Sequence, residues 1–518
     1  MKDKARNDGL IGALLMTTSA LVVKILGFLY KVPLSHYLGD EGMGYYNSAL
    51  SVYAIFYILA ASAIPKAFSI ILTRGRIHYC KKAFRISVIS FSVFFSSLGI
   101  IASLILFHCA KSLATLIGVD GAYYAIKFIA PAVFVSSLGS LCRGYLLSVN
   151  KLLSVAISEA LEATLKLLCG LFFVIYAKNK AVTLLEVSAF ATYGISIGAL
   201  VSFLFLFFNI IICKKPKHSF GNSNFSFLYF ISSILKITIP LTLTSVLISL
   251  SNILDVSLIS KGLLNAGIAK EIAVSQYGNY STLVLPLFSF VTSLASAYSL
   301  SMFPKITRAY EERNETVLLK TIQDGIPMLL CFSVFLSCGF YFFGHDYFAI
   351  VFPNSDIALG TILIKIMSPA VVFITFSTII NTILEGIGKT FAPFWTLGIA
   401  TLVKLPISYF AIKWFGILGS AFSNVISYGS GFIISYIMIS KKLKVNLIKM
   451  KDLFQSIVVC FFSFLIPFLI RYTTKNIYDT RILLLVSPII CTIIFLISLR
   501  FIYKIGQNMT PKLTFSTK

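Results

Sequence analysis

The sequence is short of charge, and of negative charge above all. Only 12% of its 518 residues are charged, with 19 Asp and Glu against 44 Lys and Arg. A soluble protein of this size carries about 25% charged residues. Hydrophobic residues make up 58% of the chain, and its mean hydropathy is +0.90. The shortage of charge excludes a soluble globular protein and indicates a protein that crosses a membrane.

The motifs of common enzymes and metal sites are missing as well. The five histidines and nine cysteines show no metal-ligand spacing, and the cysteines form no disulfide framework. The sequence has no Walker A motif, no H-E-x-x-H and no paired carboxylates on a sizeable loop. We therefore expect no enzyme, no metal and no other cofactor apart from possible Na⁺ or H⁺ coupling. A membrane-embedded transferase stays open, because such enzymes also place few polar residues among their helices.

Apolar runs of 18 or more residues recur along the whole chain, which is typical of membrane-spanning helices. The sequence predicts an all-α polytopic membrane protein with about 14 transmembrane helices. The expected spans are residues 10–32, 45–72, 86–109, 122–148, 154–177, 184–213, 228–258, 280–303, 325–345, 361–384, 392–414, 418–440, 453–471 and 482–503. No small-x-small cleavage site follows the first run, so we expect it to remain as the first helix.

The basic residues are distributed unevenly between the loops. With the N-terminus inside, the inner segments hold 27 Lys and Arg and the outer segments hold 12. Cytoplasmic loops carry such an excess, so we expect both termini to be cytoplasmic. The basic residues then act as topology determinants, and no nucleic-acid partner is expected.

The chain contains an internal repeat. Residues 131–167 align without gaps on residues 369–405, at an offset of 238 and with seven identities. An even number of spans separates the two copies, which predicts a parallel repeat about an axis along the membrane normal. We predict an N-terminal lobe (1–222), a C-terminal lobe (223–445), each of six helices, and a terminal helix pair with a cytoplasmic tail (446–518).

Three stretches near the N-terminus carry a resemblance to a known family. They are KILGFLYKVP at 24–33, LGDEGMGYY at 38–46 and AIPKA at 63–67. They resemble the start of the stage V sporulation protein B group of polysaccharide-biosynthesis flippases. That group is similar to lipid II flippases and belongs to the multidrug/oligosaccharidyl-lipid/polysaccharide exporter superfamily.

The resemblance implies a function in the bacterial cytoplasmic membrane. The substrate would be an undecaprenyl-pyrophosphate-linked saccharide, moved from the inner to the outer leaflet by alternating access, and cell-wall synthesis proteins would be possible partners. In lipid II flippases a basic residue of the first helix lines the central cavity, and Lys24 occupies that place. Lys66 lies near positions where those flippases carry further basic residues. The resemblance also implies that Tyr46 replaces their acidic residue. The saccharide, and a role in wall, spore cortex or capsule, stay open.

Lys24 and Lys31 are the first candidate cavity residues. They lie seven residues apart, on one helical stripe. One interpretation is a cavity wall where Lys24 attracts a pyrophosphate, because lysine binds phosphate as a compact point charge. The other is that Lys24 extends to the membrane surface or pairs structurally and that Lys31 marks the interface.

Further candidates lie in the repeat. Glu159, Glu162 and Lys166 share one helix face, where Glu162 and Lys166 have the spacing of an intrahelical ion pair. The alternative is a polar cavity wall. Lys404 aligns with Lys166 but has no acidic neighbour on its own helix, so another helix, water or ligand must meet its charge. Arg143 is interpreted as a topology charge rather than a ligand.

Asp255, with Asn252 one turn earlier, is the candidate for ion coupling. A carboxylate with nearby amide and hydroxyl oxygens can hold Na⁺ or pass on a proton, and intramembrane ionisable residues often serve such roles. A solvated carboxylate at the membrane interface is the alternative.

The main alternative function is that of a drug/cation antiporter of the same superfamily. Such an antiporter is expected to carry acidic cavity residues, whereas the first two predicted helices contribute Lys24 and Lys66. The sign of this charge favours an anionic substrate.

Overall fold

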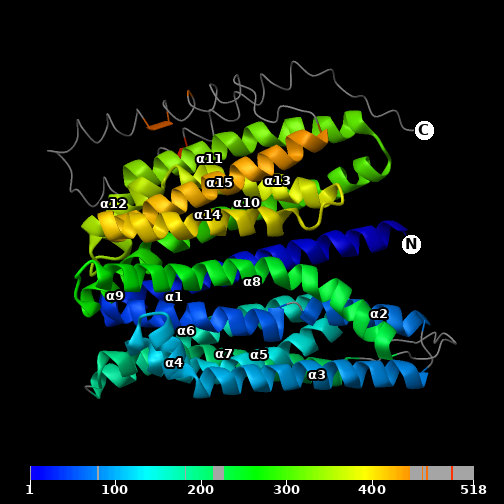
Figure 1. Cartoon of the computed structure of the whole chain (residues 1–518). Coiled ribbons are helices and arrows are strands. Elements are labelled where there is room, and N and C mark those ends of the chain that lie inside the picture. Colours follow the sequence, from blue (N-terminus) through cyan, green and yellow to red (C-terminus); the bar gives the residue numbers. More distant parts are fainter. Residues whose placement is uncertain are drawn as a thin grey trace. The chain divides into compact units, whose positions relative to one another are not determined.

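The computed structural model describes residues 2–62, 64–78, 81–180, 182–213 and 227–443, together with isolated positions after residue 457. Every regular element in this part of the chain is a helix (Figure 1). The helices are α1 (Lys2–Tyr57), η1 (Ile58–Ser62), α2 (Ile64–His78), α3 (Lys81–His108), α4 (Ala110–Leu116), η2 (Asp120–Ala122), α5 (Tyr123–Ser148), α6 (Leu152–Asn179), α7 (Leu184–Ile212), α8 (Phe227–Asn265), α9 (Lys270–Asn279), η3 (Tyr280–Val284), α10 (Leu285–Glu311), α11 (Glu315–Val351), α12 (Ile357–Met367), α13 (Ala370–Gly386), α14 (Ala392–Phe415) and α15 (Ile417–Leu443).

Helix α1 is broken at Gly39, which has a φ of 64° and a ψ of −176°. Only glycine adopts this backbone conformation at little cost. Together with η1 and α2, α1 forms one candidate span, Thr18–Thr73, of 56 residues. A straight helix of that size would be about 84 Å long, whereas a membrane core is about 30 Å thick. The break at Gly39 therefore divides the segment into two crossings, as predicted.

Two single turns of π-helix precede prolines. The turn η1 ends three residues before Pro65, and η3 ends two residues before Pro286. A proline has no backbone N–H, and its ring clashes with the carbonyl four residues earlier. The wider π turn relieves that clash and leaves carbonyl groups without intrahelical partners. One of these carbonyls becomes part of the candidate site below.

The membrane spans confirm the predicted fold class. The described residues contain ten helices that are long and apolar enough to cross a membrane, or eleven if the bent pair α12 and α13 counts as one span. With Thr18–Thr73 taken as two crossings, they account for the first twelve predicted spans. The thirteenth and fourteenth predicted spans, 453–471 and 482–503, lie outside the described residues.

The described chain groups into two compact units. The first comprises residues 1–293, 352–359 and 393–423, and the second comprises residues 294–351, 360–392 and 424–518. The predicted division into lobes at residues 222 and 445 stays a prediction. All the site residues described below belong to the first unit.

In the first unit, α7 packs against both α5 and α6. Small hydroxyl side chains bridge these helices: Thr192 Oγ1 donates to the Ala125 carbonyl at 3.1 Å, and Ser202 Oγ donates to the Ser158 carbonyl at 3.1 Å. Between membrane helices, small residues allow close approach and hydroxyl groups add hydrogen bonds. In the second unit, α11, α13 and α15 run alongside one another (Figure 1) and share a core that includes Ile322, Ile380 and Ile439.

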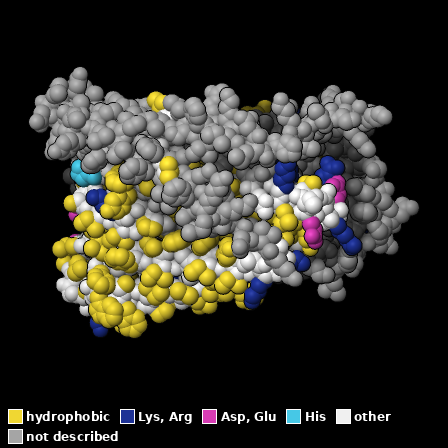
Figure 2. Space-filling model, turned by 90° about the horizontal axis from the view of Figure 1, so that it is seen from above, with side chains coloured by type: hydrophobic (Ala, Val, Ile, Leu, Met, Phe, Trp, Pro, Cys, Tyr) yellow, Lys and Arg dark blue, Asp and Glu magenta, His cyan; other side chains and the backbone are white. Residues whose placement is uncertain are grey.

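The outer surface of the described residues is apolar. Figure 2 shows hydrophobic side chains over the middle of one face, with Lys, Arg, Asp and Glu gathered towards its ends. Large hydrophobic side chains such as Phe172, Leu402 and Trp414 are more than half exposed. A water-soluble protein rarely exposes so much continuous apolar surface. Such an apolar surface is suited to contact with lipid.

The two copies of the repeat contain matching turns. Between α5 and α6, the N–H of Lys151 donates to the Leu146 carbonyl at 2.9 Å around Asn150, which has a φ of 56°. Between α13 and α14, the N–H of Lys389 donates to the Leu384 carbonyl at 2.8 Å around Gly388, which has a φ of 86°. The offset of 238 aligns each of these residues with its counterpart, so the alignment found in the sequence also pairs two turns of the same geometry.

Candidate functional site

Lys31 contacts the carbonyl group that the π turn leaves free. Its Nζ donates to the Ser281 carbonyl at 3.3 Å. In η3 the N–H of Leu285 bonds to the Tyr280 carbonyl, so the Ser281 carbonyl would need the N–H of residue 286. That residue is a proline and has none. Pro286 thus leaves the Ser281 carbonyl free to accept a hydrogen bond from Lys31, which lies 250 positions earlier in the chain.

Lys24 lies two turns earlier on α1 and approaches α10. Its Nζ donates to the hydroxyl of Ser293, and it lies 3.4 Å from the carbonyl oxygen of Ser289. The side chain is nevertheless exposed. The predicted stripe of Lys24 and Lys31 therefore follows the start of α10, and both ammonium groups bind neutral oxygens.

Lys166 on α6 lies beside the same part of α1. Its Nζ is 5.7 Å from the centre of the Tyr30 ring, within the range of a cation–π contact. Tyr30 is fixed by a hydrogen bond from its hydroxyl to the Ala191 carbonyl at 2.9 Å. It also meets the fully buried ring of Tyr46 edge to face, with 6.1 Å between the ring centres. Tyr46 thus forms an aromatic contact with Tyr30.

Arg143 corrects one interpretation of the sequence. It does not act as a loop charge: it lies inside α5, only 9% exposed, and its Nη2 is 2.5 Å from Glu162 Oε2 on α6. The same nitrogen donates to Ser202 Oγ at 3.2 Å. The intrahelical pair expected between Glu162 and Lys166 is therefore wrong, because Arg143 occupies the carboxylate.

Glu159 lies one turn before Glu162 and also faces another helix. Ser19 Oγ on α1 is 3.4 Å from Glu159 Oε2 and 3.0 Å from the Ala156 carbonyl. Glu159 and Glu162 thus join α6 to α1 and α5 respectively.

Lys404 on α14 and Asp255 on α8 form a second buried ion pair. Lys404 Nζ lies 2.6 Å from Asp255 Oδ2, and the two side chains are 6% and 12% exposed. The charge of Lys404 is therefore compensated by a carboxylate on another helix, which is one of the expected alternatives. Asn252, one turn before Asp255, is exposed.

Lys66, at the start of α2, is exposed. The structure does not bring it into the group formed by Lys24, Lys31 and Lys166.

The cations of the candidate site thus fall into two classes. Arg143 and Lys404 each contact a carboxylate within 2.6 Å. No carboxylate among the described residues comes within 4.0 Å of the ammonium groups of Lys24, Lys31 and Lys166. Positive charge without a carboxylate partner in an apolar surrounding is what an anionic ligand would neutralise.

The sequence model described as polysaccharide biosynthesis protein matches residues 10–310, which is more than half of the chain. The chain belongs to this family. A second model, described as MatE, matches residues 240–410. The chain is thus a multi-pass membrane protein of the multidrug/oligosaccharidyl-lipid/polysaccharide exporter superfamily.

Named relatives agree with the family assignment. The chain is 23% identical to stage V sporulation protein B of Bacillus subtilis (strain 168) over 474 residues, which cover 88% of this chain and 89% of the relative. It is 22% identical to the lipid II flippase MurJ of the same organism over 454 residues, with coverages of 83% and 82%.

The fold also matches a solved structure of lipid II flippase MurJ in an inward closed conformation. The TM-score is 0.74 at 15% sequence identity, and the match covers 95% of this chain and 99% of the other. At that identity the likeness concerns the fold.

The contacts of two residues in the candidate site do not follow from the sequence. Arg143 stands near the end of an apolar run, which favours a topology charge. Tyr30 lies directly beside Lys31, and nothing in its sequence position indicates that its ring contacts Lys166. The signal that could have found Arg143 is its position inside the repeat, where the aligned residue is the uncharged Asn381.

Proposed function

We propose that the protein is a flippase for an undecaprenyl-pyrophosphate-linked saccharide, lipid II or a related cell-envelope precursor. It would move this lipid from the inner to the outer leaflet by alternating access, with both termini in the cytoplasm. No covalent step is part of this proposal. The relative named as a lipid II flippase supports the substrate class.

The observation that carries the proposal is the group of three ammonium ions without carboxylate partners. A pyrophosphate brings negative charge and several acceptor oxygens, and Lys24, Lys31 and Lys166 supply positive charge and N–H donors from two helices. A charge near the membrane centre costs a few kcal/mol unless a partner or water compensates it. Binding of the anion would remove that cost for protein and lipid together.

The proposed coupling residues are Asp255 and Asn252. Lys404 Nζ already lies 2.6 Å from Asp255 Oδ2, so a tethered cation occupies the position beside the carboxylate. Na⁺ or a proton bound at Asp255 would compete with this ion pair. Coupling at this site would therefore weaken the contact between α14 and α8.

The experiment that tests the function is binding of purified, full-length protein to lipid II. Lys24→Ala, Lys31→Ala and Lys166→Ala are each expected to weaken binding about tenfold, which corresponds to about 1.4 kcal/mol. Lys111→Ala, which removes an exposed lysine remote from the three, is the control and should bind as the wild type does. Equal binding by the wild type and all three variants would contradict the proposal.

A drug/cation antiporter is the second candidate, because the MatE model matches residues 240–410. Its substrates would require carboxylates that are free to bind them. Among the candidate cavity residues, Arg143 pairs with Glu162 and Lys404 pairs with Asp255, while Glu159 contacts the Ser19 hydroxyl. Binding of lipophilic cations together with indifference to lipid II would favour the antiporter.

A further inference from the structure

Tyr30 lies where α1 meets α6 and α7, and its side chain is only 1% exposed. Its hydroxyl donates to the Ala191 carbonyl of α7 at 2.9 Å. Helix α6 contacts the same side chain at two places, because Lys166 lies over the ring and Gly170 lies beside the hydroxyl. Lys166 and Gly170 are four residues apart, so one face of α6 holds both ends of the phenol.

The hydroxyl end of Tyr30 fits into a space that two glycines leave open. A Cβ on Gly170 would lie 2.3 Å from the Tyr30 hydroxyl oxygen, which is closer than any real Cβ contact. On α7, a Cβ on Gly194 would lie 2.6 Å from the Cα of Gly170. Small residues permit such a close approach of membrane helices. A larger residue at position 170 would displace the phenol.

Tyr46 fixes the ring of Tyr30 from a further direction. The ring centres are 6.1 Å apart and the ring planes are inclined by 71°, which is the edge-to-face arrangement that aromatic pairs prefer. Tyr46 itself is fully buried. With its hydroxyl bonded, its end enclosed and its edge packed, the Tyr30 ring holds one orientation, and Lys166 Nζ lies 5.7 Å from its centre.

Lys166 has a competing partner on its own helix. Glu162 stands four residues earlier, at the spacing of an intrahelical ion pair, and the two groups interact electrostatically. Lys166 and Lys31 also interact electrostatically, and their like charges repel one another. Both effects favour movement of the Lys166 ammonium group towards Glu162 and away from Lys31. The contact with the Tyr30 ring opposes that movement.

We propose that Tyr30 is a positioning residue whose ring keeps the Lys166 ammonium group beside Lys31 and away from Glu162. This inference rests on the proposed function, because the ligand of the two lysines is the lipid-linked anion named there. The face of an aromatic ring attracts a cation through its quadrupole and carries no net charge. The ammonium group therefore keeps its full charge for a phosphate, with which a carboxylate partner would compete.

Lipid II binding by the purified, full-length protein tests this role. Tyr30→Phe keeps the ring and should bind within about twofold of the wild type. Tyr30→Met fills the space with a flexible side chain but offers no ring face, and it should bind about fivefold more weakly. Tyr176→Met is the matched control, because it removes the ring that Lys180 covers at 4.9 Å near the end of the same helix. It should bind as the wild type does.

A double variant separates positioning from a merely structural role. Lys166→Ala alone is expected to weaken lipid II binding about tenfold. If Tyr30 acts through Lys166, Tyr30→Met/Lys166→Ala should bind as Lys166→Ala does, because both changes remove the same contact. Independent effects would instead multiply to a loss of about fiftyfold.

A second measurement does not depend on the lipid. Mass spectrometry follows the rate at which an amine-reactive reagent modifies Lys166 in the ligand-free protein. Tyr30→Met should slow this reaction about threefold, because Lys166 then approaches Glu162. Tyr30→Phe should leave the rate at Lys166 unchanged, and the exposed Lys111 should react equally in all variants.

The role of Tyr30 would be overturned by wild-type lipid II affinity in Tyr30→Met, by a multiplied loss in the double variant, or by equal losses in Tyr30→Phe and Tyr30→Met. If Tyr30→Met fails to fold, Tyr30→Leu takes its place. A wild type that does not bind lipid II would contradict the proposed function, and the modification rate of Lys166 would then decide the role of Tyr30. An unchanged rate in Tyr30→Met would overturn it.

Discussion

Lys166 and Lys404 occupy aligned positions in the two copies of the repeat, at the offset of 238. Lys166 on α6 has Glu162 one turn before it, yet its Nζ lies over the ring of Tyr30. Lys404 on α14 has no acidic residue at the aligned positions of its own helix, yet it forms a buried ion pair with Asp255. In each copy, the partner comes from a different helix.

The difference shows that tertiary packing decides the charge pairing in this protein. Surface ion pairs at i,i+4 are worth only about 0.2–0.5 kcal/mol. A buried arginine needs a carboxylate far more, since an unpaired buried charge costs several kcal/mol. Arg143 therefore takes Glu162, and Lys166 forms no ion pair with this carboxylate within 4.0 Å. The lysine of the first copy thus stays outside an ion pair, while the lysine of the second copy pairs with Asp255.

The largest effect is expected from breaking the Arg143–Glu162 pair. Arg143→Met leaves the partly buried Glu162 carboxylate without its cation, which should destabilise the protein by about 4 kcal/mol. Thermal unfolding of the purified protein measures this loss. The double variant Arg143→Met/Glu162→Leu removes both charges and should recover most of the stability. An unchanged unfolding temperature in the single variant would show that the pair is not structural.

A smaller loss, about 3 kcal/mol, is expected for Lys404→Met, which leaves Asp255 without its ammonium partner. The second change Asp255→Asn should restore part of the stability, because it removes the uncompensated charge. Unfolding temperatures of both variants beside the wild type check the prediction. If Lys404→Met lost no stability, the pair at 2.6 Å would not hold α14 to α8.

The aligned substitution Lys166→Met should behave in the opposite way. With no carboxylate partner among the described residues to leave behind, its free energy of unfolding should change by under about 1 kcal/mol, while the affinity for lipid II falls about tenfold. Lys404→Met, measured in parallel, is the matched comparison. A loss of stability in Lys166→Met as large as that in Lys404→Met would remove the distinction between the two copies.

The spans and the repeat could be predicted because they depend on local sequence. Apolar runs determine which helices cross a membrane, and the turn at Asn150 and that at Gly388 are set by the few residues around them. The break at Gly39 likewise falls in the loop predicted between the first two spans.

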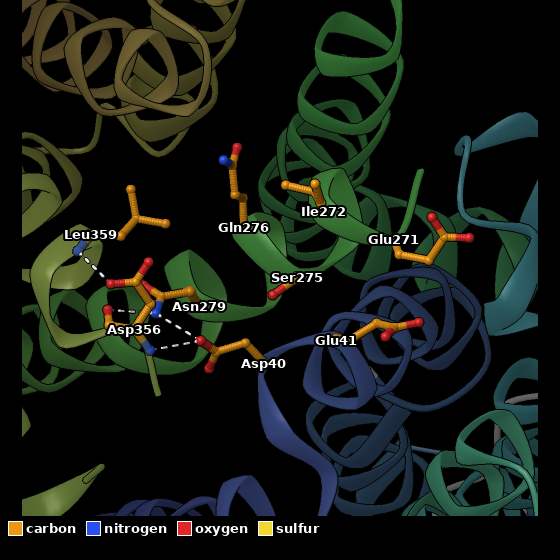
Figure 3. A pocket seen from close by; sticks show the side chains of 9 residues that line it. All are labelled: Asp40, Glu41, Glu271, Ile272, Ser275, Gln276, Asn279, Asp356 and Leu359. Atoms are coloured by element: carbon orange, nitrogen blue, oxygen red, sulfur yellow. Dashed lines mark hydrogen bonds between the residues drawn. The ribbon is translucent and has the colours of Figure 1, made fainter. Parts of the chain in front are cut away.

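The charge pairing and the hydrogen bonds of Asp40 could not be predicted, since both depend on how helices are rotated and placed against one another. The pair of Arg143 with Glu162 requires the relative rotation of α5 and α6, which periodicity does not give. Asp40, Asn279 and Asp356 are separated by 239 and 77 positions in the chain. The packing of α1 against α9 brings Asp40 to Asn279, and the segment before α12 adds Asp356 (Figure 3).

The smallest effect is expected at the matching turns. Gly388 has a φ of 86° and Asn150 has a φ of 56°, and the left-handed region costs a residue with a Cβ about 1–2 kcal/mol. Gly388→Ala should therefore destabilise the protein by about 1 kcal/mol, whereas Asn150→Gly should be neutral, because glycine adopts this region freely. Unfolding temperatures of the two variants provide the test. Since both turns close with the same hydrogen bond, equal losses in the two variants would mean that the side chain of Asn150 stabilises its turn beyond its backbone preference.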